Sequence, residues 1–98
     1  MSLPVVLRAE AEAEFDGAFD VYDGRQAGLG AESTAEVQRV FDRLSVNPLI
    51  HQEVFADIRK SVVNRFPFCV YYRPHADRVE VLSVLHTSRD PSVWQSRV

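Results

Sequence analysis

The C-terminal part of this 98-residue chain contains three strand-like segments that are apolar on both faces. They cover 58–63, 65–73 and 78–86, and the short gaps between them predict an antiparallel meander. Strict alternation along the third segment puts Val79, Val81 and Leu85 on one face and Leu82, Val84 and His86 on the other. A sheet with one face in water lacks this pattern, so both faces must be covered.

Two helical segments upstream can cover one of these faces. Both have apolar residues at i, i+3, i+4 and i+7, which are Phe15, Ala18, Phe19 and Tyr22 in the first and Val37, Val40, Phe41 and Leu44 in the second. The connection of about seven residues between them permits only an antiparallel helical hairpin. The helical pattern is broken at Gly24 and then by the Gly28-Leu29-Gly30 motif. Its two glycines fit turn chemistry, because a dinucleotide-binding loop needs a third. Asn47-Pro48 is expected to end the second helix.

These elements predict an α+β fold, with residues 1–98 forming a single domain. We expect a short strand at 5–7 to join an edge of the sheet and 49–57 to be a loop. Asp90-Pro91 is expected to begin a short C-terminal helix that carries Trp94. The helical hairpin covers one face of the sheet, and so short a chain has little left for the second. A partner protein is therefore expected there.

Several functional classes find no support in the sequence. No apolar run is long enough to span a bilayer, and no basic-then-apolar leader opens the chain, so we expect a cytoplasmic protein without a membrane partner. The single cysteine, Cys69, excludes an intrachain disulfide and is expected to be a small buried residue. The three histidines are scattered, so neither a metal nor another cofactor is expected.

Charge is distributed unevenly. Residues 1–57 contain four basic and eleven acidic residues, whereas 58–98 contain seven basic and three acidic residues. A basic sheet beside acidic helices fits an anionic ligand or an acidic partner, and equally fits internal charge complementarity. Arg59, Arg65 and Arg89 lie on or beside the meander, where guanidinium groups can bind phosphates or carboxylates. The alternative is that they are solvated residues that protect the sheet edge.

Motifs along nearly the whole chain resemble the RelE/ParE superfamily of type II toxins, which includes plasmid stabilisation proteins. The motifs are Ala18 and Tyr22, Gly28-Leu29-Gly30, Asn47-Pro48, Asp57-Ile58-Arg59, 65–72, and 86–91 with Trp94. The resemblance implies the compact RelE/ParE-like α+β fold. It also implies a cognate antitoxin whose C-terminal tail lies along the toxin surface and orders on binding.

The resemblance leaves two mechanisms open. RelE-like members are ribosome-dependent endoribonucleases that cleave mRNA, and His86 would then act as general acid or base, with Arg59 and Arg65 on the scissile phosphate. However, in the strand that starts at Phe68 an apolar residue takes the position where some ribonucleases have an arginine, and Thr87-Ser88 replaces a histidine-tyrosine pair. These departures favour the ParE-like branch, whose members inhibit DNA gyrase and are not enzymes that cut RNA.

The ParE-like interpretation assigns a functional surface to the C-terminal half. Its target- or antitoxin-binding residues are Arg59, Arg65, Arg89, Tyr71 and Trp94, together with His86. We expect the antitoxin to occupy an apolar groove between the helical hairpin and the sheet. A degenerate, non-toxic member that only binds antitoxin is a third interpretation. A homodimer and a toxin–antitoxin hetero-oligomer are both open.

Overall fold

The computed structural model describes residues 2–98 and has the predicted α+β architecture. Its elements are β1 (Val5–Leu7), α1 (Ala9–Arg25), α2 (Leu29–Val46), β2 (Glu53–Phe55), β3 (Ile58–Val62), β4 (Phe68–Pro74), β5 (Val79–His86) and α3 (Ser92–Gln95). The loop predicted at 49–57 was wrong in part, because this stretch contains β2. All three residues of β2 are exposed, so they give no periodic signal, and a tight turn at Ala56 with φ of 51° returns the chain to β3.

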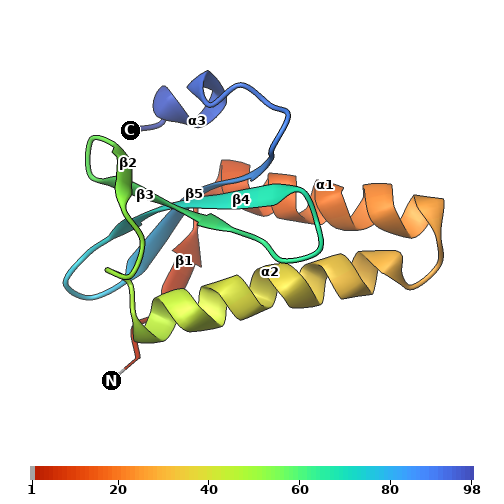
Figure 1. Ribbon diagram of the computed structural model, residues 1–98, viewed down its shortest axis with the longest axis horizontal. Coiled ribbons are helices and arrows are strands. Elements are labelled where there is room, and N and C mark those ends of the chain that lie inside the picture. The colour runs from red at the N-terminus through yellow and green to blue at the C-terminus, as the bar shows by residue number, and fades with distance from the viewer. Residues whose placement is uncertain (1) are drawn as a thin grey trace.

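The strands form one sheet in the order β1-β5-β4-β3-β2. The meander β3-β4-β5 is antiparallel as predicted, and β1 joins its edge in parallel with β5. Figure 1 shows α1 and α2 side by side on one side of this sheet and α3 on the other. None of the helices in residues 2–98 has the length and apolar character needed to cross a membrane.

A β-bulge corrects the predicted faces of β5. Tyr71 pairs with Ser83 but Tyr72 pairs with Val81, which leaves Leu82 as an extra residue in β5. The extra residue reverses the alternation. The helix side of β5 therefore carries Val79, Val81, Val84 and His86, and the opposite side carries Leu82 and Leu85. The prediction that Val84 and His86 face away from Val79 and Val81 was wrong, because it assumed unbroken alternation.

The helical hairpin depends on two glycines, one between its helices and one at the start of α2. Gly28 has φ of 88°, a left-handed conformation that glycine adopts without steric cost, and its N–H donates to Asp23 Oδ1 at 3.0 Å. A Cβ at Gly30 would lie only 2.7 Å from the backbone oxygen of Phe19. Gly28 confirms the predicted turn, whereas Gly30 lies in the first turn of α2, where the missing Cβ lets the helices approach closely.

The second face of the sheet is covered by the chain itself. The helix α3 places Trp94, which is 1% exposed, on Tyr71 with ring centroids 4.4 Å apart and planes inclined by 25°. The buried cluster beneath it consists of Ile58, Cys69, Tyr71, Leu82, Leu85 and Trp94. The expectation that this face needs a partner protein was wrong, because a helix of only four residues closes it. Burial also raises the pKa of the Cys69 thiol.

β1 pairs with only part of the β5 edge, and side chains hydrogen-bond to the backbone groups of β5 beyond it. The carboxylate of Glu14 accepts hydrogen bonds from the Val84 N–H at 3.2 Å and the Ser83 hydroxyl at 2.9 Å. Arg97 pairs with Glu14 at 3.2 Å and donates to the Leu82 carbonyl at 2.8 Å. Because Arg97 follows α3, this ion pair also fastens the C-terminal segment to the sheet.

We predict that Glu14→Ala lowers the free energy of unfolding by about 1–3 kcal/mol, because it leaves buried groups of β5 without an acceptor. Trp94 is the only tryptophan, so its fluorescence should shift to the red as α3 loosens. The matched control is Glu10→Ala on the same helix, where the side chain is exposed and the change should stay within about 0.5 kcal/mol. Equal stability of the two variants would contradict the role given to Glu14.

Candidate functional site

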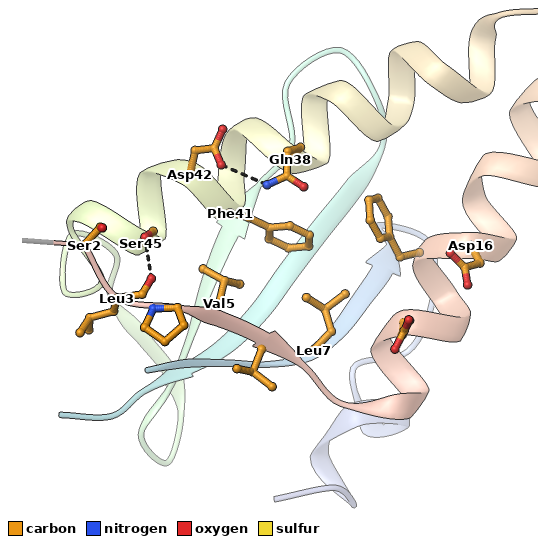
Figure 2. Close-up of a pocket in the computed structure, with 13 residues that line it drawn as sticks. Ser2, Leu3, Val5, Leu7, Asp16, Gln38, Phe41, Asp42 and Ser45 are labelled. Atoms are coloured by element: carbon orange, nitrogen blue, oxygen red, sulfur yellow. Dashed lines mark hydrogen bonds between the residues drawn. The ribbon is translucent and has the colours of Figure 1, made fainter. Parts of the chain in front are cut away.

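An open groove of about 920 Å³ lies where β1 meets the two long helices, and we call it the β1 groove. Figure 2 shows Val5 and Leu7 of β1 pointing into it, with Phe41 projecting from α2. Phe41 makes an edge-to-face contact with Phe15 of α1, with ring centroids 5.6 Å apart. The floor is therefore apolar and is built from three separate segments of the chain.

The rim of the β1 groove is acidic. Glu12 and Asp16 contribute carboxylates from α1, and Asp42 contributes one from α2, where Gln38 donates to it at 3.0 Å. Asp16 and Asp42 lie on opposite sides of the groove (Figure 2). The described residues that line it include no lysine or arginine. An occupant with basic side chains beside apolar ones would match this surface.

The groove also exposes the edge of a strand. In the parallel ladder, the Pro4 carbonyl accepts from Val79 N at 2.9 Å, and Arg8 N donates to the Val81 carbonyl at 3.0 Å. Alternate residues of a parallel strand bond to the same neighbour, so the backbone groups of Val5 and Leu7 point away from β5. An edge strand of this kind is a template for an added strand from another chain.

Arg59, predicted to bind the target, holds the segment after α2 in place. Its Nη1 donates to the carbonyls of Leu49 at 3.3 Å and His51 at 2.5 Å, and its Nη2 lies 3.4 Å from Glu53. The side chain is only 18% exposed. Burial, together with the charge of Arg43, lowers the pKa of His51 and favours its neutral ring. Arg59 is therefore committed to contacts within the chain.

Arg65, His86 and Arg89 gather at the other end of the sheet. Arg65 lies in the β3–β4 turn with φ of 69°, and its exposed guanidinium is 3.9 Å from Glu32. His86 ends β5, and its Nδ1 accepts the Ser88 N–H at 3.0 Å. The exposed residue Arg89 follows in the same turn and donates its N–H to the His86 carbonyl at 3.0 Å.

The structure does not bring Arg59 and His86 together. Arg59 pairs with Tyr72 near the end of β4, whereas His86 pairs with Phe68 at the start of β4. Four residues of extended strand separate these positions by roughly 13 Å. A site that requires both side chains on one phosphate is therefore not assembled.

Tyr71 and Trp94, the remaining predicted binding residues, lie in the buried cluster under α3. Burial raises the pKa of the Tyr71 hydroxyl. Neither ring is at the surface in this structure, so direct binding through them requires α3 to leave the sheet.

The residues of the β1 groove were not identified from the sequence. Glu12 and Asp16 at i and i+4 gave the one local signal, an acidic strip on the first helix. The floor and the rim come from β1, α1 and α2, and only the tertiary structure brings these segments together.

Comparisons with known proteins agree with this architecture. The family model described as "ParE toxin of type II toxin-antitoxin system, parDE" matches residues 5–91. A solved structure described as "Chromosomal ParDE TA system from P. aeruginosa" is similar in fold, with a TM-score of 0.77 and 14% sequence identity. The similarity covers 89% of this chain and 98% of that one. None of the curated proteins compared with the chain matches it.

We predict that Arg59→Ala lowers the free energy of unfolding by about 1–3 kcal/mol, because the carbonyls of 49–51 lose a charged donor. Hydrogen exchange should also become faster in the segment that follows α2. Lys60→Ala on the same strand is the matched control, since Lys60 is exposed, and it should change stability by less than about 0.5 kcal/mol. A stable Arg59→Ala protein with unchanged exchange would contradict the structural role.

Proposed function

This chain belongs to the ParE family of toxins of type II toxin-antitoxin systems, and on that basis we propose that it inhibits DNA gyrase and is neutralised by a cognate antitoxin. The family match over residues 5–91 is the observation that carries the proposal. Gyrase acts on DNA in the cytoplasm, and the proposal places the toxin there.

The β1 groove is the proposed seat of the antitoxin. It combines an apolar floor, an acidic rim and an open strand edge, which suit an extended segment with apolar and basic side chains. Val6, on the exposed edge strand, is itself 48% exposed. A segment that is disordered when free can follow such a shallow groove and order on contact.

Two observations favour gyrase inhibition over ribosome-dependent RNA cleavage. The guanidinium of Arg59 is engaged by the carbonyls of Leu49 and His51, so it is not free to hold a scissile phosphate. His86 lies roughly four strand residues from it along the sheet, which corresponds to about 13 Å. General acid–base catalysis needs its groups within hydrogen-bonding reach of one substrate.

Expression of the toxin alone tests the proposed function. We expect growth arrest with induction of the SOS response, and inhibition of supercoiling when the purified toxin is added to purified gyrase. Co-expression of the short reading frame beside the toxin should restore growth.

The ribonuclease alternative predicts a different outcome of the same experiment. Primer extension on translated messages would then show cuts in the ribosomal A site, and His86→Ala would abolish them. Cuts of this kind together with normal supercoiling would overturn gyrase as the target. Absence of any growth effect from a folded, antitoxin-binding protein would indicate a non-toxic family member.

We predict that Asp16→Lys combined with Asp42→Lys weakens antitoxin binding by about tenfold, since each exposed ion pair contributes up to about 1 kcal/mol. Isothermal titration calorimetry measures the change directly. Asp20→Lys is the matched control, because Asp20 is exposed on α1 but does not line the β1 groove. Equal affinities of the wild type and the double variant would contradict the proposed seat.

A further inference from the structure

A second, smaller pocket lies beside the C-terminal half of α1 and shares no lining residue with the β1 groove. It has a volume of about 220 Å³. Its lining residues come from α1, from the start of β4 and from the end of β5: Gly17, Ala18, Val21, Tyr22, Arg25, Phe68 and His86. We call it the aromatic pocket. The small residues Gly17 and Ala18 leave the space that a larger side chain on α1 would fill.

A continuous row of rings forms the floor of the aromatic pocket and extends beyond it. Tyr22 contacts Phe66 and Phe68 edge to face, with centroid distances of 5.1 and 5.8 Å. Phe68 in turn contacts His86 at 5.5 Å. Tyr22, Phe66 and Phe68 are buried in the main hydrophobic core, so the packing around them holds the row rigid. A rigid apolar floor lowers the entropic cost of binding a side chain.

Two guanidinium groups border the same row, and the one of Arg65 also lies 3.9 Å from Glu32. The guanidinium of Arg25 lies 5.4 Å from the centre of the Tyr22 ring, and that of Arg65 lies 5.5 Å from the centre of Phe66. Both arginines are exposed. His86 accepts the Ser88 N–H at Nδ1, so the neutral ring carries its proton on Nε2 and can donate from there. The pocket thus combines an apolar interior with donors for an anion at its margin.

We propose that the aromatic pocket receives one apolar side chain of the toxin's target protein. A neighbouring carboxylate of the target then binds the guanidinium of Arg25 and the other donors at the margin of the pocket. The identification of the occupant as the target rests on the proposed function. A volume of about 220 Å³ suits a single side chain. The antitoxin is a less suitable occupant of this pocket, because the β1 groove proposed for it has an acidic rim, whereas arginines border the aromatic row.

A nucleic acid fits this surface less well than an acidic peptide. Two exposed carboxylates lie near this row: Asp20 follows Gly17 by three residues on α1, and Glu32 is 3.9 Å from the Arg65 guanidinium; the chain as a whole has a net charge of -3. A phosphate backbone carries a charge at every nucleotide and would meet these carboxylates, whereas a peptide can present one carboxylate opposite Arg25.

Blocked dipeptides test the recognition chemistry without the target. We expect N-acetyl-Phe-Glu-amide to shift the NMR amide signals of Gly17, Val21 and His86 in the labelled toxin, with saturation at millimolar concentration. N-acetyl-Phe-Gln-amide should bind about fivefold more weakly, and Arg25→Gln should remove this difference. Equal affinity of the wild type for both peptides, shifts elsewhere on the protein, or tighter binding of an oligothymidylate in the pocket would overturn the proposal.

A second experiment tests the assignment to the target. Arg25→Glu should raise the toxin concentration needed to inhibit gyrase by about tenfold or more, with antitoxin affinity unchanged, because a charge reversal turns attraction into repulsion. Arg43→Glu, a charge reversal at an exposed residue of α2 that lines neither pocket, is the control. Unchanged inhibition by Arg25→Glu would overturn the assignment to the target. Lack of gyrase inhibition by the wild type would instead refute the proposed function, and the dipeptides would still decide the binding chemistry.

Discussion

Burial of a sheet that is apolar on both faces is the constraint on which the rest of this structure depends. The helical hairpin covers one face, and the stacking of Trp94 on Tyr71 closes the other. The Glu14–Arg97 ion pair fastens this second cover and satisfies the β5 edge beyond β1. The chain covers both faces itself, and the two candidate partner surfaces, the β1 groove and the aromatic pocket, lie at its margins.

The sequence predicted the elements whose signal is local and repeated. Apolar residues at helical spacing located α1 and α2, and apolar segments separated by short gaps located β3, β4 and β5. It missed β2, which is short and exposed, and it could not show the bulge at Leu82, because one added residue leaves no mark in composition. It also placed Trp94 in a short helix without showing that this helix covers the sheet.

Only those parts of the candidate site that are formed by residues close together in the sequence could be predicted. His86 and Arg89 share a turn, so their proximity follows from the sequence. The β1 groove and the row from Phe66 to His86 depend on segments far apart in the chain, and only their packing shows them. Carboxylates from the acidic N-terminal half border the β1 groove, whereas one arginine from each half, Arg25 and Arg65, borders the aromatic row. On the proposed function, this separation lets antitoxin and target bind different surfaces of opposite charge.

The most direct measurement is hydrogen exchange on the wild-type toxin, free and bound to its antitoxin. The central claim is that the antitoxin occupies the β1 groove while α3 remains on the sheet. We predict that binding slows exchange in β1 and in the facing turns of α1 and α2, and leaves the segment around Trp94 unchanged. Slower exchange confined to the face under α3, together with faster exchange of α3 itself, would contradict the claim.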